Sequence, residues 1–300
     1  MTVLLTGAHG TVGTAVTANS AYDYVLLDRE RAPAKLDDGT PHPHHDRETI
    51  VVDVGADGAV GDLTNAMTEH EVAAVVHLAG DPTVSATYAS VERNNVRGTR
   101  NVLEAASRAD VGVVVFASSN HVVGMYEREH APELYEPGFD LTVDRESPIR
   151  PDSDYGASKA AGESWCRLYA EQEGIDCYAL RIGSVRDSTD DHPFGDAERA
   201  VERGDCERGD DAYAESVARM RCTWLSRRDC GALVDACLRD GLGGDGDRTT
   251  ETVAGGAFET LYGISDNPNA WFDLEHARER VGYDPVDSGS EPSEPPVKYS

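Results

Sequence analysis

Short apolar runs alternate with helical stretches through the first 185 residues of the chain. Six runs are rich in valine and uninterrupted, namely Val3–Thr6, Tyr24–Leu27, Ile50–Val54, Ala74–Leu78, Val113–Ala117 and Cys177–Ile182. Runs of this kind suit strands that are buried on both faces of a parallel sheet. Apolar residues between two of the runs recur at helical spacing, at Val91, Val96, Val102, Leu103 and Ala106. The alternation predicts an α/β fold with a doubly wound parallel sheet, which would bind ligand beyond the carboxyl ends of its strands.

The pattern changes after Gly183. Residues 187–218 are rich in Asp, Glu, Arg and Gly and show little periodicity, so they predict a long surface excursion. Helical patterning returns near residues 229–239 and 274–281, and residues 288–300 hold Pro, Ser and Glu. We therefore expect a core over 1–185, a small C-terminal substrate-binding lobe with returning core elements over 186–287, and a flexible tail over 288–300.

Charge narrows the choice of partners. The chain holds 55 Asp and Glu against 27 Lys and Arg, a formal net charge of -28, and the acidic residues are interleaved with apolar segments. Such a field repels nucleic acid and anionic lipid, so neither is an expected partner. No stretch reaches the roughly 18 apolar residues that span a bilayer. Met1 leads directly into the first apolar run without a basic segment, which predicts a cytoplasmic protein.

The basic residues are almost all arginine. Lys35, Lys159 and Lys298 are the only lysines in the sequence. A dispersed acidic, lysine-poor surface resembles adaptation to a salt-rich cytoplasm, where high ionic strength screens the self-repulsion. An ordinary acidic protein is the alternative interpretation.

Cysteine and histidine spacing argue against a disulfide framework and against a metal centre. The six cysteines include no C-x-x-C pair, so they are expected to be free thiols. His42, His44 and His45 fall in a segment with Pro and Asp between the second and third predicted strands. We expect an exposed loop there, with a metal site as the less favoured alternative, and predict no metal ligands.

A glycine-rich turn follows the first predicted strand. Residues Gly7-Ala8-His9-Gly10-Thr11-Val12-Gly13 form a G-x-x-G-x-x-G pattern that leads into a helical stretch. Glycines let the backbone turn sharply and approach a pyrophosphate, which is then held at the positive end of the helix. The context of strand, turn and helix therefore predicts a dinucleotide site.

Acidic and small residues at the following strand ends fit the rest of that ligand. Asp28 ends the second strand, where a carboxylate would accept hydrogen bonds from the adenine ribose and repel a 2′-phosphate, which favours NAD over NADP. Arg29, which follows, leaves room for the use of both NAD and NADP. The alternative role of Asp28 is that of a turn residue at the end of the strand. Asp53 ends the third strand, within reach of the adenine amino group. Leu78-Ala79-Gly80 after the fourth strand would leave space for the nicotinamide-side ribose.

Tyr155 and Lys159 form a Y-x-x-x-K pair at the start of a helical stretch. The i, i+4 spacing places both side chains on one helix face. Chance predicts only about 0.1 such pair from this composition, so the pattern is informative. A tyrosine is a poor base at neutral pH, and a nearby ammonium favours its phenolate form. Ser119, after the fifth strand, would hold the substrate oxygen, and its alternative role is a strand-end cap.

Together these motifs resemble the extended short-chain dehydrogenase/reductase superfamily, which is the NAD-dependent epimerase/dehydratase family. Asn95 in Asn94-Asn95-Val96-Arg97-Gly98-Thr99 joins the resemblance, which extends to Val281-Gly282-Tyr283-Asp284-Pro285. The resemblance implies a Rossmann-type fold and hydride transfer with NAD. Epimerases of the family carry S-S-x-x-V-Y-G, whereas this chain reads Ser118-Ser119-Asn120-His121-Val122-Val123-Gly124 and lacks that tyrosine.

The Ser-Ser-Asn-His sequence is similar instead to uronate dehydrogenases and to NAD-dependent glucose-6-phosphate dehydrogenases of salt-loving microbes. Those enzymes oxidise the C1 hydroxyl of a cyclic sugar to a lactone. The resemblance implies Ser119, Tyr155 and Lys159 as catalytic residues, and Ser119, Asn120, His121, Tyr155, Ser184 and Arg219 as sugar-binding residues. The implied NAD-binding residues are Gly7, Gly10, Thr11, Val12, Gly13, Asp28, Arg29, Asp53, Val54, Leu78, Ala79, Gly80, Asn95, Tyr155, Lys159 and Ile182.

The sugar itself stays open at this point. Arg219 corresponds to an arginine that holds the carboxylate in uronate dehydrogenases, and its alternative role is a surface arginine. Residues 187–218 depart from the shorter loop of those enzymes. A 6-phosphosugar such as glucose-6-phosphate, a uronate and a neutral aldose are therefore all candidate substrates, and a homo-oligomer is compatible with the resemblance. The alternatives are a nucleotide-sugar epimerase or dehydratase that retains its NAD, and a non-catalytic NAD sensor.

Overall fold

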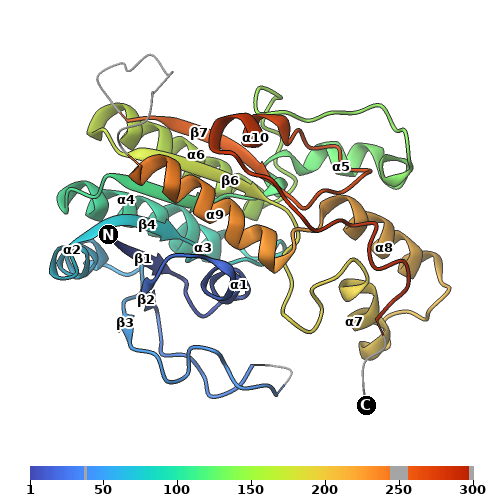
Figure 1. Ribbon diagram of the computed structural model, residues 1–300, viewed down its shortest axis with the longest axis horizontal. Coiled ribbons are helices and arrows are strands. Elements are labelled where there is room, and N and C mark those ends of the chain that lie inside the picture. The colour runs from blue at the N-terminus through green and yellow to red at the C-terminus, as the bar shows by residue number, and fades with distance from the viewer. Residues whose placement is uncertain (37–38, 244–255, 297–300) are drawn as a thin grey trace.

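The computed structural model describes residues 1–36, 39–243 and 256–296. Its described strands form one parallel sheet of seven strands in the order β3-β2-β1-β4-β5-β6-β7 (Figure 1). The strands are β1 (Thr2–Thr6), β2 (Tyr24–Asp28), β3 (Thr49–Val51), β4 (Val72–His77), β5 (Val113–Ala117), β6 (Asp176–Ile182) and β7 (Phe258–Gly263). The strand order reverses between β1 and β4, and the carboxyl ends of strands on either side of such a point form the ligand crevice of a doubly wound sheet. The predicted fold class is confirmed.

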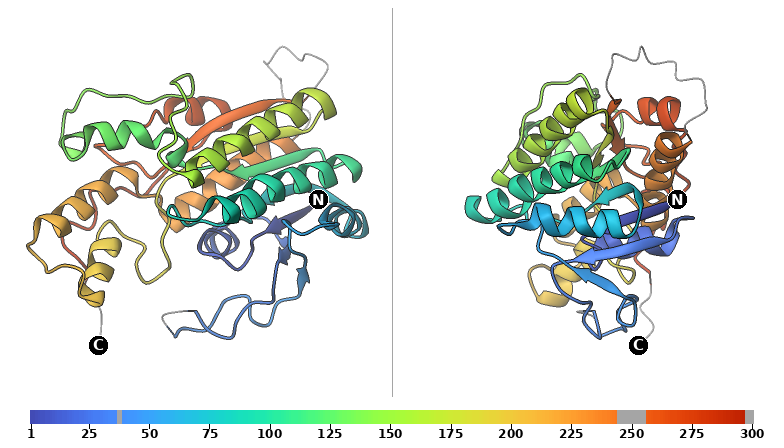
Figure 2. Two further views of the ribbon diagram at one scale, coloured as in Figure 1. Left: turned by 180° about the vertical axis from the view of Figure 1, so that it is seen from behind. Right: turned by 90° about the vertical axis from the view of Figure 1, so that its left-hand side faces the viewer.

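Helices cover both faces of the sheet, as the two views in Figure 2 show. One face is covered by α1 (Thr11–Asn19), α9 (Arg227–Leu242) and α10 (Glu275–Val281), and the other by α2 (Ala59–Glu69), α4 (Gly98–Arg108) and α6 (Asp154–Glu173). Alternate residues of a strand point to opposite faces, so Val3 and Leu5 pack in the first layer and Leu4 in the second. Burial on both faces explains why the strands read as uninterrupted apolar runs.

The remaining elements lie around the carboxyl ends of the strands. They are α3 (Tyr88–Val91), the π-helical turn η1 (Glu92–Arg97), the 3₁₀ turns η2 (Asn120–Val123) and η3 (Glu133–Tyr135), α5 (Gly124–His130), α7 (Gly195–Arg203) and α8 (Asp211–Thr223). In Figure 1, α5, α7 and α8 stand together beside the sheet. Of these, α7 and α8 lie within the predicted lobe over 186–287, whereas α5 comes from the predicted core, and the division into core and lobe stays a prediction.

The predicted surface excursion over residues 187–218 contains two helices that its weak periodicity did not indicate, α7 and much of α8. Phe194, Ala197 and Val217 make a small apolar cluster of their own between the helices. Besides this apolar cluster, hydrogen bonds from Arg186 and Arg199 to Asp196 hold α7 in place. Three apolar positions among many charged ones give too weak a periodicity to be recognised, because much of the contact is ionic.

Three further expectations need correction. Strand β7, at the sheet edge, was not predicted, since its sequence Phe-Glu-Thr-Leu-Tyr-Gly has two polar residues in succession and so does not form a continuous apolar run. The third strand ends at Val51, so Asp53 lies beyond it. The loop that carries the histidines is not simply exposed, because His42 and His44 are buried while His45 is exposed.

A buried ion pair joins α6 to the sheet. The guanidinium of Arg181, on β6, donates from Nε and Nη2 to the two carboxylate oxygens of Glu163, each at 2.9 Å. Ser118 donates to the same carboxylate at 2.6 Å, and Arg181 Nη1 donates to the Tyr262 hydroxyl at 2.9 Å. Every charged group here has its partners, as burial requires. The network fixes α6 against the ends of β5 and β6.

Two expectations from composition can be compared with the fold. All six cysteines are unpaired, and all but Cys206 are buried, which confirms the predicted free thiols. Within residues 1–36, 39–243 and 256–296, no helix combines the length and the apolar character needed to cross a membrane. The segment that was expected to form a flexible tail contacts the rest of the chain near its start. The Gly289 amide donates to Asn267 Oδ1 at 2.8 Å.

Candidate active site

The glycine-rich turn packs tightly against the segment that follows β4. Gly7 has a φ of +68°, and a Cβ there would lie 2.6 Å from the Ala79 nitrogen. A Cβ at Gly13 would lie 2.5 Å from the Ala8 carbonyl oxygen. Gly10 precedes α1 and offers no side-chain cap, so the first amides of this helix are left to a ligand. The turn therefore has the close packing and the open helix N-terminus that hold a pyrophosphate.

Two further residues of this turn were predicted to bind the cofactor. The Thr11 hydroxyl donates to Asp187 Oδ1 at 2.6 Å, and Val12 lines a cleft together with Ile182. Arg227, at the start of α9, donates to the Thr11 carbonyl oxygen at 3.2 Å. Neither Asp187 nor Arg227 was predicted, because both lie in charged segments where no spacing singles them out.

Asp28 is held at the end of β2 by two backbone amides. Its Oδ2 accepts the amide of His9 at 2.9 Å, and its Oδ1 accepts the amide of Arg29 at 2.7 Å. The carboxylate is thereby oriented beside the glycine-rich turn with lone pairs left for ribose hydroxyls. The Arg29 side chain is exposed and lies 3.7 Å from Glu30, so nothing in its contacts commits it to a 2′-phosphate.

Asp53 forms an ion pair with Arg93, in the η1 turn. It accepts Arg93 Nη2 at 2.6 Å and the Gly55 amide at 3.0 Å. Burial acts to raise the pKa of Asp53, but these hydrogen bonds outweigh it and hold the pKa below its usual range. The neighbouring Val54 is buried in the core, and its carbonyl oxygen accepts Asn101 Nδ2 at 2.8 Å. Contacts of Asp53 and Val54 with an adenine stay predictions.

Asn95 connects the segment after β4 with α6. Leu78, Ala79 and Gly80 follow β4 directly, as predicted. Asn95 Oδ1 accepts the Asp81 amide at 2.6 Å, and its Nδ2 donates to Ser158 Oγ at 2.9 Å. A Cβ at Gly80 would lie 3.0 Å from Asn95 Oδ1, so the glycine lets the two segments approach. Buried Asn95 thus positions the loop that was predicted to face the nicotinamide ribose.

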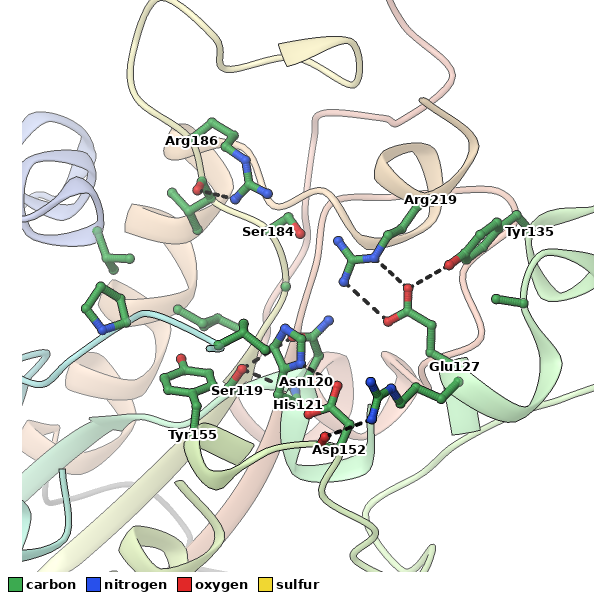
Figure 3. A pocket seen from close by; sticks show the side chains of 18 residues that line it. Ser119, Asn120, His121, Glu127, Tyr135, Asp152, Tyr155, Ser184, Arg186 and Arg219 are labelled. Carbon is green, nitrogen blue, oxygen red and sulfur yellow. Dashed lines mark hydrogen bonds and ion pairs between the residues drawn. The ribbon is translucent and has the colours of Figure 1, made fainter. Parts of the chain in front are cut away.

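A cleft of about 610 Å³ opens at the carboxyl ends of β5 and β6. All six residues predicted to bind the sugar line it, namely Ser119, Asn120, His121, Tyr155, Ser184 and Arg219. Figure 3 shows Tyr155 and Ser119 on one side and Arg219 on the other, with Asn120 and His121 between them. Ser184 follows β6, and its hydroxyl lies 3.2 Å from the Thr223 hydroxyl of α8. The fold therefore gathers residues that are up to 100 positions apart in the sequence.

Tyr155, Lys159 and Ser119 come together at the base of this cleft. Ser153 caps α6, so Tyr155 lies in its first turn, where Ser119 is its hydrogen-bond partner. The Lys159 ammonium donates to the Ala117 carbonyl oxygen at 2.7 Å and lies 5.8 Å from the centre of the Tyr155 ring. Ser119 also caps η2 by accepting the His121 amide at 3.2 Å, so the two roles considered for it are compatible.

Burial dominates the electrostatics of this group. It raises the pKa of Tyr155, against the hydrogen bond from Ser119, and it lowers the pKa of Lys159 to about 8. The net shift of the Tyr155 pKa in the chain alone is therefore upward, opposite to the lowering expected from a nearby ammonium, because burial is the largest effect. At neutral pH the tyrosine therefore keeps its proton and the lysine its charge.

His121 is oriented by a residue that the sequence did not single out. Its Nδ1 lies 2.8 Å from Asp152 Oδ2, and its ring packs edge-on against Tyr155. A Cβ at Gly124 would lie 2.3 Å from Asp152 Oδ2, so the glycine makes room for this carboxylate. Burial acts to raise the pKa of Asp152, but the hydrogen bond from His121 lowers it. With Nδ1 on Asp152, Nε2 is the ring nitrogen of His121 that is left for a substrate in the cleft.

Arg219 is paired with a carboxylate inside the cleft. Its Nε donates to Glu127 Oε1 at 2.5 Å and its Nη2 to Glu127 Oε2 at 3.3 Å (Figure 3). The Tyr135 hydroxyl donates to the same carboxylate at 2.8 Å. Glu127 and Tyr135 were not predicted, because only the packing of α5 and η3 against α8 brings them here. Arg186 also lines the cleft, and both its Nε and Nη2 donate to Asp196.

A doubly wound sheet with a tight glycine turn before a helix, a carboxylate at the end of β2 and a Ser–Tyr–Lys group is typical of NAD-dependent dehydrogenases of the short-chain type. Comparison with family models agrees, because residues 3–196 match the NAD dependent epimerase/dehydratase family. The chain belongs to this family. The predicted membership of this family and the predicted cofactor, NAD, are confirmed.

Comparison with individual proteins extends the likeness over nearly the whole chain. An NAD-dependent glucose-6-phosphate dehydrogenase of Haloferax volcanii is 38% identical, with 96% of this chain and 94% of the relative covered. An L-arabinose 1-dehydrogenase (NAD(P)(+)) of the same organism is 33% identical, covering 96% and 97%. Among solved structures, glucuronic acid dehydrogenase from Chromohalobacter salexigens is 26% identical with a TM-score of 0.65, covering 96% and 85%. The predicted enzyme class, an NAD-dependent oxidoreductase, is likewise confirmed.

The position of Asp28 makes a prediction about cofactor choice. We expect the purified chain to bind NADH at least about tenfold more tightly than NADPH, because the held carboxylate repels a 2′-phosphate. Asp28→Ala should narrow that ratio, whereas Asp23→Ala, at an exposed position just before β2, should leave it unchanged. Fluorescence titration with both reduced cofactors measures the ratio. An Asp28→Ala variant with the parent ratio would contradict the assignment.

Proposed function

We propose that this chain is an NAD-dependent sugar 1-dehydrogenase that oxidises the C1 hydroxyl of a cyclic aldose to a lactone. The observation that carries the proposal is one cleft lined by Ser119, Asn120, His121 and Tyr155, with Arg219 on its far side. The three relatives compared above are named for oxidation of a sugar or a sugar acid, which supports the same substrate class.

The residues divide the chemistry of this oxidation between them. The C1 hydroxyl gives its proton to the phenolate of Tyr155 as the C–O double bond forms. Ser119 holds the substrate oxygen, and the Lys159 ammonium stabilises the negative charge of the phenolate. NAD, when bound, accepts the hydride that leaves C1. One hydride and one proton leave the sugar, so the products are the lactone and NADH.

The far side of the cleft favours an anionic substrate, and we infer a 6-phosphosugar first. Arg219 presents a guanidinium there, and Arg128 from α5 lines the same cleft and donates to the Asp152 carbonyl oxygen at 3.2 Å. A guanidinium binds phosphate or carboxylate through two parallel hydrogen bonds. Asp196 matches the charge of Arg186, and Glu127 matches that of Arg219, so an anionic group would share Arg219 with Glu127. A uronate would use the same arginines, whereas a neutral aldose would leave Arg219 paired with Glu127 alone.

A nucleotide-sugar epimerase that retains its NAD is the alternative within this family. Such an enzyme returns the hydride to the sugar, so it yields no net NADH and keeps its cofactor during purification. The epimerase tyrosine of S-S-x-x-V-Y-G is replaced by Val123 in this chain, which favours the dehydrogenase.

The proposal predicts NADH formation from an aldose. We expect the chain, assayed with NAD⁺ in molar KCl, to reduce NAD⁺ with at least one of glucose-6-phosphate, glucuronate and L-arabinose. Tyr155→Phe should lower kcat by at least about 10³-fold and leave the affinity for NADH nearly unchanged, because only the proton path is lost. Tyr169→Phe, farther along the same helix and outside the cleft, is the matched control. Absence of NADH with all three sugars, or activity in Tyr155→Phe, would refute the proposal.

Substitution of Arg219 distinguishes the substrate classes. We predict that Arg219→Ala lowers kcat/KM for an anionic sugar about 100-fold, as expected when a charged hydrogen-bonding partner is removed, and scarcely changes it for a neutral aldose. Glu127→Gln should lower KM for the anionic sugar, since it removes the carboxylate that competes for Arg219. Arg203→Ala, at an exposed ion pair on α7, is the control. An unchanged kcat/KM for the anionic sugar in Arg219→Ala would contradict this assignment.

A further inference from the structure

Three histidines from two separate segments meet beside the glycine-rich turn. His9 lies within that turn, and His42 and His44 lie in the long connection from β2 to β3, which hangs below the sheet in Figure 1. Their ring centres form a nearly equilateral triangle with sides of 5.5, 5.5 and 5.4 Å. One nitrogen of each ring lies within 4.8 Å of the other two. His42 and His44 are buried, and His9 is partly exposed.

Each ring is oriented from outside by a contact to its Nε2. His9 Nε2 lies 3.1 Å from the Thr49 hydroxyl, and His44 Nε2 lies 2.8 Å from the Thr17 hydroxyl. His42 Nε2 lies 3.2 Å from the carbonyl oxygen of His9. Hydroxyl and carbonyl partners on the outer ring nitrogen are the contacts that orient metal-bound histidines in proteins. This leaves the three Nδ1 atoms as the inward group.

One pair of nitrogens in the cluster has the spacing of two ligands on one metal ion, and the third histidine offers a nitrogen within 4.8 Å of both. His9 Nδ1 and His44 Nδ1 are 3.4 Å apart. Two nitrogens bound to one tetrahedral zinc ion at about 2.0–2.1 Å are separated by about 3.4 Å. At this distance the two nitrogens share either a proton or a cation. His42 Nδ1 accepts the amide of His44 at 3.0 Å, so a bound ion would replace that hydrogen bond.

We propose that His9, His42 and His44 bind one transition-metal ion of the zinc type. Neutral imidazole suits Zn²⁺, Cu²⁺ and Ni²⁺, and the absence of a carboxylate from this cluster disfavours Mg²⁺ and Ca²⁺. Three protein ligands leave a fourth position for water on the partly exposed side at His9. The net charge of -28 raises the local concentration of cations.

The site connects the β2–β3 segment to the turn that holds the cofactor. The backbone amide of His9 is the group that Asp28 accepts at 2.9 Å. A metal ion on the His9 ring would therefore fix the same residue from its side chain that Asp28 fixes from its backbone. Its role is structural, because none of the three histidines lines the cleft with Tyr155.

Zinc titration of untagged, EDTA-treated protein tests the proposal. We expect the chain to bind one equivalent of Zn²⁺ and its melting temperature to rise with the zinc concentration. The double substitution His42→Ala/His44→Ala should lower zinc affinity by at least about 100-fold. His45→Ala, next to His44 but exposed, should bind like the parent chain. Absence of zinc binding by the parent, or equal binding by the double variant, would overturn the site.

X-ray absorption on the unaltered chain keeps the test independent of how the variants fold. The zinc-loaded protein should show three or four nitrogen or oxygen neighbours at about 2.0–2.1 Å with an imidazole pattern. A zinc–sulfur distance of about 2.3 Å would place the ion on a cysteine and reject the histidine site. Neither readout involves sugar oxidation, so the outcome does not depend on the proposed function.

Discussion

The buried ion pair between Glu163 and Arg181 is the interaction on which the geometry of the site depends. Both side chains are almost fully buried, 5% and 2% exposed, and removal of one partner from such a pair costs about 3–5 kcal/mol. The pair fixes α6 against β6, and the bond from Ser118 to Glu163 extends the connection to the end of β5. Ser119, next to Ser118, and Tyr155, eight residues before Glu163 on the same helix, are thereby held together.

The same docking explains the state of Lys159. Its ammonium is buried against the Ala117 carbonyl oxygen, and burial lowers its pKa to about 8 while raising that of Tyr155. The Lys159 ammonium lies 5.8 Å from the centre of the Tyr155 ring, and a positive charge nearby favours a phenolate once that phenolate forms. The Asn95–Ser158 hydrogen bond joins the predicted cofactor side of the site to the same helix. Helix α6 thus organises both the proposed catalytic residues and the predicted cofactor contacts.

Local patterns made much of this predictable. Buried parallel strands appear as continuous apolar runs, so six strands could be recognised, and the glycine turn and the Tyr155–Lys159 spacing are short-range motifs. The residues predicted to bind a sugar came from resemblance rather than from spacing. Strand β7 was missed because two polar residues interrupt its apolar run, and α7 because ionic contacts hold much of it.

The residues that could not be predicted from the sequence are defined by contacts between segments that lie far apart along the chain. Asp152 orients His121 from 31 positions away, and Glu127 pairs with Arg219 from 92 positions away. The histidine triangle needs the β2–β3 segment to fold back on the glycine-rich turn, which no local periodicity indicates. Such pairs exist only once the strands are in order, because each partner alone is an ordinary polar residue in a loop or helix.

The pH dependence of kcat/KM for sugar oxidation tests the central claim, that the buried Tyr155 is the base. A base must lose its own proton before it can accept one from the sugar, and burial raises the pKa of Tyr155, so kcat/KM should rise about tenfold per pH unit between pH 6 and about 8. A kcat/KM that is constant or falls over this range would contradict the claim, because a buried tyrosine could not then be the group that must lose a proton.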